Sequence, residues 1–152
     1  MKLVVLLFAV VACASAPPPR VRTFAPMDRA AVTAVLEEQM AAWNRGDLAG
    51  YMAGYAKIDT LVFTSGGKVR TGWQATFDSY QTKYGKDPST MGKLAFSITQ
   101  VDAVGADGAV VLGTWALTES QAPGSGVFTV VLERRPEGWR IIHDHTSLAP
   151  PA

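Results

Sequence analysis

The chain has 152 residues, of which 14 are lysine or arginine and 13 are aspartate or glutamate, so its formal net charge is +1 with neutral histidines. A balance this close to zero argues against a nucleic-acid partner, which calls for a strongly basic surface. With 48% hydrophobic residues the chain can build a core, and its length suits one domain rather than two.

Residues 1–16 have the pattern of an export signal. Met1–Lys2 supply a charged start, an apolar run covers residues 3–12, and small residues follow. The run is about half as long as the roughly 20 residues that a membrane-spanning helix needs, so a permanent span is not expected. We predict an exported protein that is periplasmic or lipid-anchored in the bacterial envelope.

Cys13 is the only cysteine, which excludes a disulfide within the chain. The run Val10–Cys13 resembles a bacterial lipobox, in which the cysteine becomes the lipid-modified first residue of the mature protein. Two alternatives stay open: cleavage after the small residues Ala14–Ala16, although Pro17 would follow the cut, and an unmodified Cys13 inside a discarded signal. Membrane contact is expected only through such a lipid anchor.

A proline-rich linker, residues 17–27, precedes the predicted domain at residues 28–149. The first helix is expected over residues 28–44, because its apolar residues recur at spacings of three and four. A short second helix should follow from Leu48, and a third is expected over residues 73–84.

Strand signals separate the last two helices and fill the rest of the chain. Residues 61–64 form a short apolar run before a Ser-Gly-Gly-Lys turn. Four longer segments then alternate with short turns, so neighbouring strands should pair antiparallel; these segments are 94–104, 109–120, 127–135 and 139–147. The order of elements predicts an α+β domain with three helices on one face of a strongly curved, mostly antiparallel sheet.

Three stretches resemble one known family. Ala41–Leu48 between the first helices, Gly72 before the third helix and the terminal Gly138–Ser147 are similar to the SnoaL-like branch of the nuclear transport factor 2-like superfamily, over roughly residues 30–147. The resemblance implies a cone-shaped α+β barrel with a pocket between the helices and the concave sheet face. It does not imply one reaction, because the family includes isomerases, polyketide cyclases, dehydratases, epoxide hydrolases and inert binding domains.

A ketosteroid-isomerase type of site in this fold needs a tyrosine on the first helix and two aspartates. The resemblance places the tyrosine position at Gln39, and the aspartates near Phe63 or Thr64 and near Val130 or Val131. None of these is the required residue, so that proton-shuttle mechanism has no groups to run it.

Both histidines of the chain, His143 and His145, flank Asp144 on the last predicted strand. Strand side chains alternate between two faces, so Asp144 is expected opposite both histidines. All three are candidate catalytic residues, as general acid or base in a cyclase or dehydratase type of reaction. The alternative for the histidines is the convex face of the sheet; a metal site is not expected, because no third ligand has a recognisable spacing.

In related kinase association domains, the pocket is lined by the residues of this strand that alternate with the histidine positions. The resemblance therefore implies that Ile142, Asp144 and Thr146 point toward the pocket. Aromatic residues favour a cavity for a flat apolar ligand, although an aromatic stripe also suits a plain core. The predicted pocket residues are Trp43, Tyr55, Phe63, Trp73, Phe77, Tyr80, Trp115, Val130, Ile142 and Thr146, with Tyr51, Arg70 and Glu119 as further polar candidates.

Two functions stay open. The first is binding of a small apolar or carboxylate-bearing molecule without turnover. The second is a lyase or isomerase in which Asp144 or a histidine moves a proton beside a carbonyl; an acid on the concave face within hydrogen-bond reach of a tyrosine would favour it. No cofactor is expected, because the sequence has no glycine-rich phosphate loop and no Cys-x-x-Cys pair. A homodimer through the convex sheet face is expected to coexist with either function.

Overall fold

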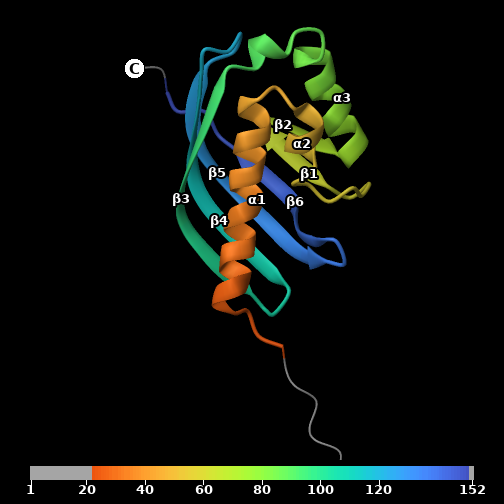
Figure 1. Cartoon of the computed structure of the whole chain (residues 1–152), viewed down its shortest axis with the longest axis vertical. Helices are drawn as coiled ribbons and strands as arrows, with labels where there is room; N and C mark the ends of the chain where they lie inside the picture. The colour runs from red at the N-terminus through yellow and green to blue at the C-terminus, as the bar shows by residue number, and fades with distance from the viewer. Residues whose placement is uncertain (1–21, 151–152) are drawn as a thin grey trace, which may run out of the picture.

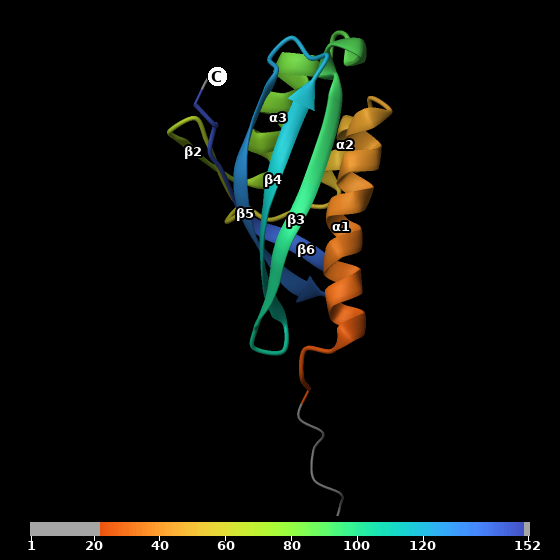
Figure 2. The same ribbon diagram turned by 90° about the vertical axis from the view of Figure 1, so that its left-hand side faces the viewer.

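In the computed structural model, which describes residues 22–150, three helices pack against one face of a curved six-stranded sheet (Figures 1 and 2). The expected signal segment, Cys13 and the first part of the linker lie outside the described residues. The element order is two helices, a β-hairpin, a third helix and a meander of four long strands. This order confirms the predicted α+β fold class.

The helix ends are set by local capping. The Asp28 carboxylate accepts a hydrogen bond of 2.9 Å from the Ala25 N–H, so the first helix already begins at the proline that follows Ala25. Asp47 caps the second helix by accepting from the Gly50 N–H at 2.7 Å. Gly72 precedes the third helix with a φ of +95°, which favours glycine. The helices are α1 Pro26–Asn44, α2 Leu48–Met52 and α3 Trp73–Tyr84, followed by the short 3-10 helix η1 Pro88–Met91.

The sheet brings the first strand of the chain against the last. Its order is β2-β1-β6-β5-β4-β3, and all neighbours are antiparallel except β1 and β6, which are parallel. Phe63 on β1 is therefore the register partner of Asp144 on β6, although the sequence separates them widely. The strands are β1 Val62–Ser65, β2 Lys68–Thr71, β3 Lys93–Val104, β4 Gly108–Thr118, β5 Gly124–Arg135 and β6 Gly138–Thr146.

A β-bulge at Ile142 changes the predicted facing of the last strand. Leu132 on β5 pairs with Ile141, and Val131 pairs with His143, so Ile142 has no partner in the register. The bulge interrupts the two-residue alternation. Ile141 and Asp144 are consequently both buried, while Ile142 is half-buried. The expectation that Ile142 shares the pocket-facing side of the strand with Asp144 is wrong for this reason.

The core lies between the helices and the concave face of the sheet. Leu36, Met52 and Ile141 are at most 2% exposed, and burial of each such side chain contributes about 1.5–3 kcal/mol. Of the four polar side chains that are buried within residues 22–150, Gln39 at 1% and Asp144 at 5% exposure lie in the same layer. Polar side chains are uncommon inside an apolar core, and those found there usually have a hydrogen-bond partner. Gln39 and Asp144 therefore indicate where a functional site is expected. No helix within residues 22–150 is long and apolar enough to cross a membrane.

Candidate functional site

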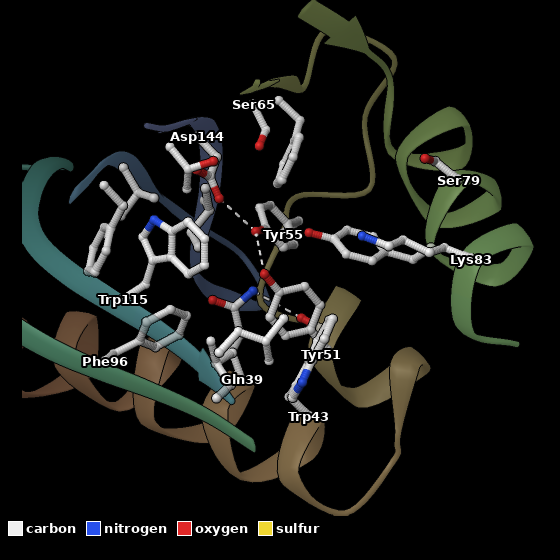
Figure 3. A pocket seen from close by; sticks show the side chains of 18 of the residues that line it. Gln39, Trp43, Tyr51, Tyr55, Ser65, Ser79, Lys83, Phe96, Trp115 and Asp144 are labelled. Carbon is white, nitrogen blue, oxygen red and sulfur yellow. Dashed lines mark hydrogen bonds between the residues drawn. The ribbon is translucent and has the colours of Figure 1, made fainter. Parts of the chain in front are cut away.

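A cavity of about 470 Å³ lies between the three helices and the concave face of the sheet (Figure 3). Its size is within the usual range of small-molecule sites. Nine of the described lining residues are aromatic, and they provide flat apolar surfaces for a ring-containing ligand. The aromatic lining residues are Trp43, Tyr51, Tyr55, Phe63, Tyr80, Tyr84, Phe96, Trp115 and Phe128.

Asp144 of β6 is the single acidic residue among the described residues that line this cavity. Its Oδ2 accepts a hydrogen bond of 2.7 Å from the Tyr55 hydroxyl, whereas its Oδ1 is buried and has no partner within residues 22–150 (Figure 3). Burial disfavours the charged form and raises the pKa of Asp144 to about 7, while the hydrogen bond from Tyr55 opposes this shift. The carboxyl group therefore changes charge near neutral pH, where a general acid or base is most effective.

Backbone pairing places Tyr55 beside Asp144. Tyr55 follows α2 and makes an isolated parallel bridge with Ile141 of β6. The Ile141 N–H donates to the Gly54 carbonyl at 2.9 Å, and the Ala56 N–H donates to the Ile141 carbonyl at 2.8 Å. Three residues of the helical layer thus join the edge of a strand, and the phenol is aimed at the carboxyl group by main-chain geometry.

Tyrosine hydroxyls form a chain that ends at Asp144. Tyr51 and Tyr55 hydroxyl oxygens are 3.2 Å apart. Because a phenol has one proton and Tyr55 donates its own to Asp144, Tyr51 must donate to Tyr55. Burial raises the pKa of Tyr51 to about 12 and those of Tyr55 and Tyr80 well above 10. All three phenols therefore stay protonated and act as hydrogen-bond donors.

Gln39 closes the inner end of the cavity. Its Nε2 donates to the Tyr51 backbone carbonyl at 3.0 Å, which joins α1 to α2. Trp43, one helical turn further along α1, packs edge-to-face on Tyr51, with ring centroids 5.0 Å apart. These contacts hold Tyr51 in place, so the hydroxyl chain has a rigid support.

Basic residues gather where the cavity opens. Lys68 and Arg70 of β2 and Lys83 of α3 all line it. The lining residues that are solvent-exposed mark the open side, and they include Lys68, Lys83 and Leu148. The cavity thus has one buried acid, several aromatic wall residues and cations at the opening.

The structure brings most of the predicted pocket residues together on the cavity wall: Trp43, Tyr55, Phe63, Tyr80, Trp115, Val130, Asp144 and Thr146, and also the lower-ranked Tyr51 and Arg70. Trp73, Phe77 and Glu119 are not part of the lining. Trp73 and Phe77 stack on each other at 5.2 Å, and the Trp73 Nε1 donates to the Met52 carbonyl at 3.0 Å. They lie on a neighbouring face of α3. Ile142 is also outside the lining, because the bulge places Ile141 on the cavity side of β6 in its stead.

The two histidines lie away from the cavity. His143 and His145 are exposed and on the opposite face of β6 from Asp144, as strand alternation beyond the bulge requires. Within residues 22–150 no group of three or more potential ligands is arranged to hold a metal ion.

Of the three cations at the opening, sequence reasoning named Arg70 and missed Lys68 and Lys83. Lys83 lies three residues after Tyr80 and next to Tyr84, so helical spacing was a usable signal for its position. Lys68 and Ser65 are register partners in the β1–β2 hairpin, on the same face as Phe63. Whether this face of the hairpin points toward the cavity depends on how the hairpin packs in the folded domain, and the sequence has no signal for that packing.

The layered arrangement around an aromatic cavity defines the class as the nuclear transport factor 2-like α+β fold. A nuclear transport factor 2-like protein of unknown function from Shewanella oneidensis is similar at 36% identity, with 78% of this chain and 98% of that chain covered and a TM-score of 0.74. The family model of the SnoaL-like domain matches residues 32–151, and the chain belongs to this family.

More distant structures share the fold alone. A ketosteroid isomerase-like protein from Erwinia carotovora is 21% identical, with 83% of this chain and 99% of that chain covered and a TM-score of 0.68. A nuclear transport factor 2-like superfamily protein from Salmonella enterica is 15% identical, with coverage of 83% and 94% and a TM-score of 0.66. No protein of curated function matches the chain.

Proposed function

We propose that the domain binds a small, largely apolar molecule in the cavity, with a hydrogen-bonding group of that molecule at Asp144. The observation that carries this proposal is a buried carboxyl group, held by Tyr55 at 2.7 Å, in a cavity with nine aromatic lining residues. Its Oδ1 lacks a partner within the described residues, and an unpaired buried polar atom is costly. A ligand group that hydrogen-bonds to Oδ1 removes this cost and so favours the bound state.

Aromatic walls supply the apolar contact. Trp43 and Tyr51 are almost fully buried, whereas Trp115 and Phe96 are half-buried and face the cavity from β4 and β3. Contact with such rings stabilises a bound flat molecule through burial of apolar area on both partners. A ligand with one or two rings fits a cavity of about 470 Å³.

Proton transfer is the second candidate function, and the titration of Asp144 favours it. A carboxyl group with a pKa of about 7 can remove a proton beside a carbonyl and return it to a neighbouring carbon. Tyr55 holds the carboxyl in position for this transfer. The exposed histidines leave Asp144 as the candidate base for a lyase or isomerase reaction.

Native mass spectrometry of the protein purified from its own envelope fraction tests the binding proposal. A retained small molecule that is lost in Asp144→Asn and in Trp115→Ala supports it, since both variants alter the cavity wall. Recovery of the same molecule at unchanged occupancy in both variants contradicts it. The same spectrum reports the subunit number and any lipid on Cys13, and so tests the proposed export, lipid anchor and convex-face homodimer.

Turnover is separated from binding by deuterium exchange. The probe is 2-tetralone, whose ring fits the cavity walls and whose protons beside the carbonyl exchange with D2O. Exchange that the wild type accelerates and Asp144→Asn does not supports proton transfer. Saturable binding of the probe with no acceleration favours a binding domain without turnover.

A further inference from the structure

The cations at the opening come from two separate elements. On the β1–β2 hairpin, Phe63 pairs with Arg70 and Ser65 pairs with Lys68. Register partners in antiparallel strands point to the same face, so both cations follow Phe63 toward the cavity. Lys83 arrives from α3, one turn after Tyr80, and faces the same space.

No anionic partner of these three cations lies within the described part of the chain. None of the ion pairs within residues 22–150 involves Lys68, Arg70 or Lys83. Two of them lie over rings of the cavity wall instead: the Arg70 guanidinium carbon is 5.9 Å from the Phe63 ring centroid, and Lys83 Nζ is 5.0 Å from that of Tyr84. Their charges remain available to an anion at the opening.

The buried acid sets the direction of an anionic ligand. A ligand carboxylate next to Asp144 would either meet a second negative charge where the dielectric constant is low or force Asp144 to keep its proton, and both cost free energy. The same carboxylate at the opening meets three cations and bulk water. We propose that the ligand is an anionic amphiphile: its anionic oxygen group lies at Lys68, Arg70 and Lys83, its apolar body lies against the aromatic walls, and its uncharged polar end lies at Asp144. This inference rests on the binding function proposed above.

Two fluorescent probes that differ by one charge test the proposal. 6-Hydroxy-2-naphthoate has a carboxylate at one end of a flat ring system, and 2-naphthol is the same hydroxylated body without it. Titrations follow tryptophan fluorescence of the purified protein at near-neutral pH, at low salt and again at about 0.5 M NaCl, where exposed charges are screened. We expect the anionic probe to bind about tenfold more tightly at low salt, and this advantage to shrink at high salt.

Charge-neutralising variants assign the advantage to the opening. Lys83→Gln and Arg70→Gln should each weaken binding of the anionic probe by about three- to tenfold, and weaken 2-naphthol binding by a clearly smaller factor. Lys57→Gln is the matched control, because Lys57 Nζ also lies 5.0 Å from an aromatic centroid, that of Trp73, which is not part of the cavity wall. Circular dichroism melts check that each variant is folded.

Each outcome decides a different point. Equal affinity of the two probes, or equal effects of Lys57→Gln and Lys83→Gln, overturns the anionic amphiphile and leaves the binding function standing. If neither probe binds at millimolar concentration, the proposed binding of a flat apolar molecule is itself contradicted. If the anionic probe binds more tightly, and only Arg70→Gln and Lys83→Gln reduce this advantage, the result supports both the anionic amphiphile and the proposed binding function.

Discussion

The Tyr55 hydroxyl donates a 2.7 Å hydrogen bond to Asp144 across 89 positions of the sequence. The two residues meet because the Gly54 and Ala56 backbones pair with Ile141 on β6, three positions before Asp144. The acid of the candidate site is therefore positioned by main-chain hydrogen bonds between the helical layer and the last strand. Changes to either side chain are expected to alter the charge of the site while the fold persists.

Asp144 should make the protein less stable as the pH rises from about 4 to about 7. Its pKa is about 7 in the folded state, against 3.8 for an unperturbed aspartate. In this window the folded state keeps a proton that the unfolded state has lost, so the free energy of unfolding falls with pH, by about 4 kcal/mol in total. Urea unfolding of the wild type and Asp144→Asn at several pH values measures the effect.

The difference between the two proteins isolates Asp144 from other carboxylates. The pKa values of Asp28, Asp47 and Asp87 are lowered by hydrogen bonds. Their contributions to the free energy of unfolding are therefore lost only as the pH falls below about 4, whereas that of Asp144 is lost as the pH rises. Asp144→Asn should be the more stable protein at pH 8. A constant difference between pH 4 and pH 8 would show that Asp144 does not titrate in this range.

Tyr55→Phe should raise the pKa of Asp144 further. The hydrogen bond from Tyr55 favours the carboxylate, so its loss leaves burial unopposed. Carbon-13 NMR titration of the aspartate carboxyl carbons measures the shift directly. Tyr51→Phe is the control, because it removes the next hydroxyl of the chain and leaves the bond to Asp144 intact. A pKa that is equal in both variants would contradict the direct role of Tyr55.

Removal of both histidines should leave ligand affinity unchanged within about twofold, as expected for exposed residues away from a site. His143 and His145 are exposed on the face of β6 that is opposite Asp144. Titration of 6-hydroxy-2-naphthoate into the double variant His143→Ala/His145→Ala provides the measurement. A much larger loss of affinity would place a histidine in the site and remove Asp144 as its sole acid–base candidate.

Gly92→Ala should lower the free energy of unfolding by at least about 3 kcal/mol. Gly92 has a φ of +74°, and a Cβ there would overlap the backbone between Thr118 and Ser120. Gly105→Ala is the matched control, because its φ is +68° but a Cβ there has no neighbour within 4 Å; it should cost about 1–2 kcal/mol. Thermal melts compare the variants. Equal losses would mean that the overlap beside Thr118 is relieved by a small movement.

The fold could largely be predicted because its signals are local. Apolar residues at helical spacing predict α1, and short turns between long alternating segments predict the antiparallel meander of β3 to β6. The parallel pairing of β1 with β6 joins residues that are far apart in sequence, so no short-range pattern carries it. The bulge at Ile142 was also hidden, because an unpaired residue is defined only by the register with Val131 and Leu132.

For the site, the sequence by itself determined the materials: one acid between two histidines on the last strand, and many aromatic residues for a wall. Tertiary structure decided which of them act together. In the folded domain Asp144 is buried beside Tyr55, both histidines are exposed, and Trp73 and Phe77 lie outside the cavity lining. The physical reason is that the pKa of a group, its hydrogen bonds and the side to which it points depend on its neighbours in space. These neighbours belong to strands and helices that come into contact only in the folded domain.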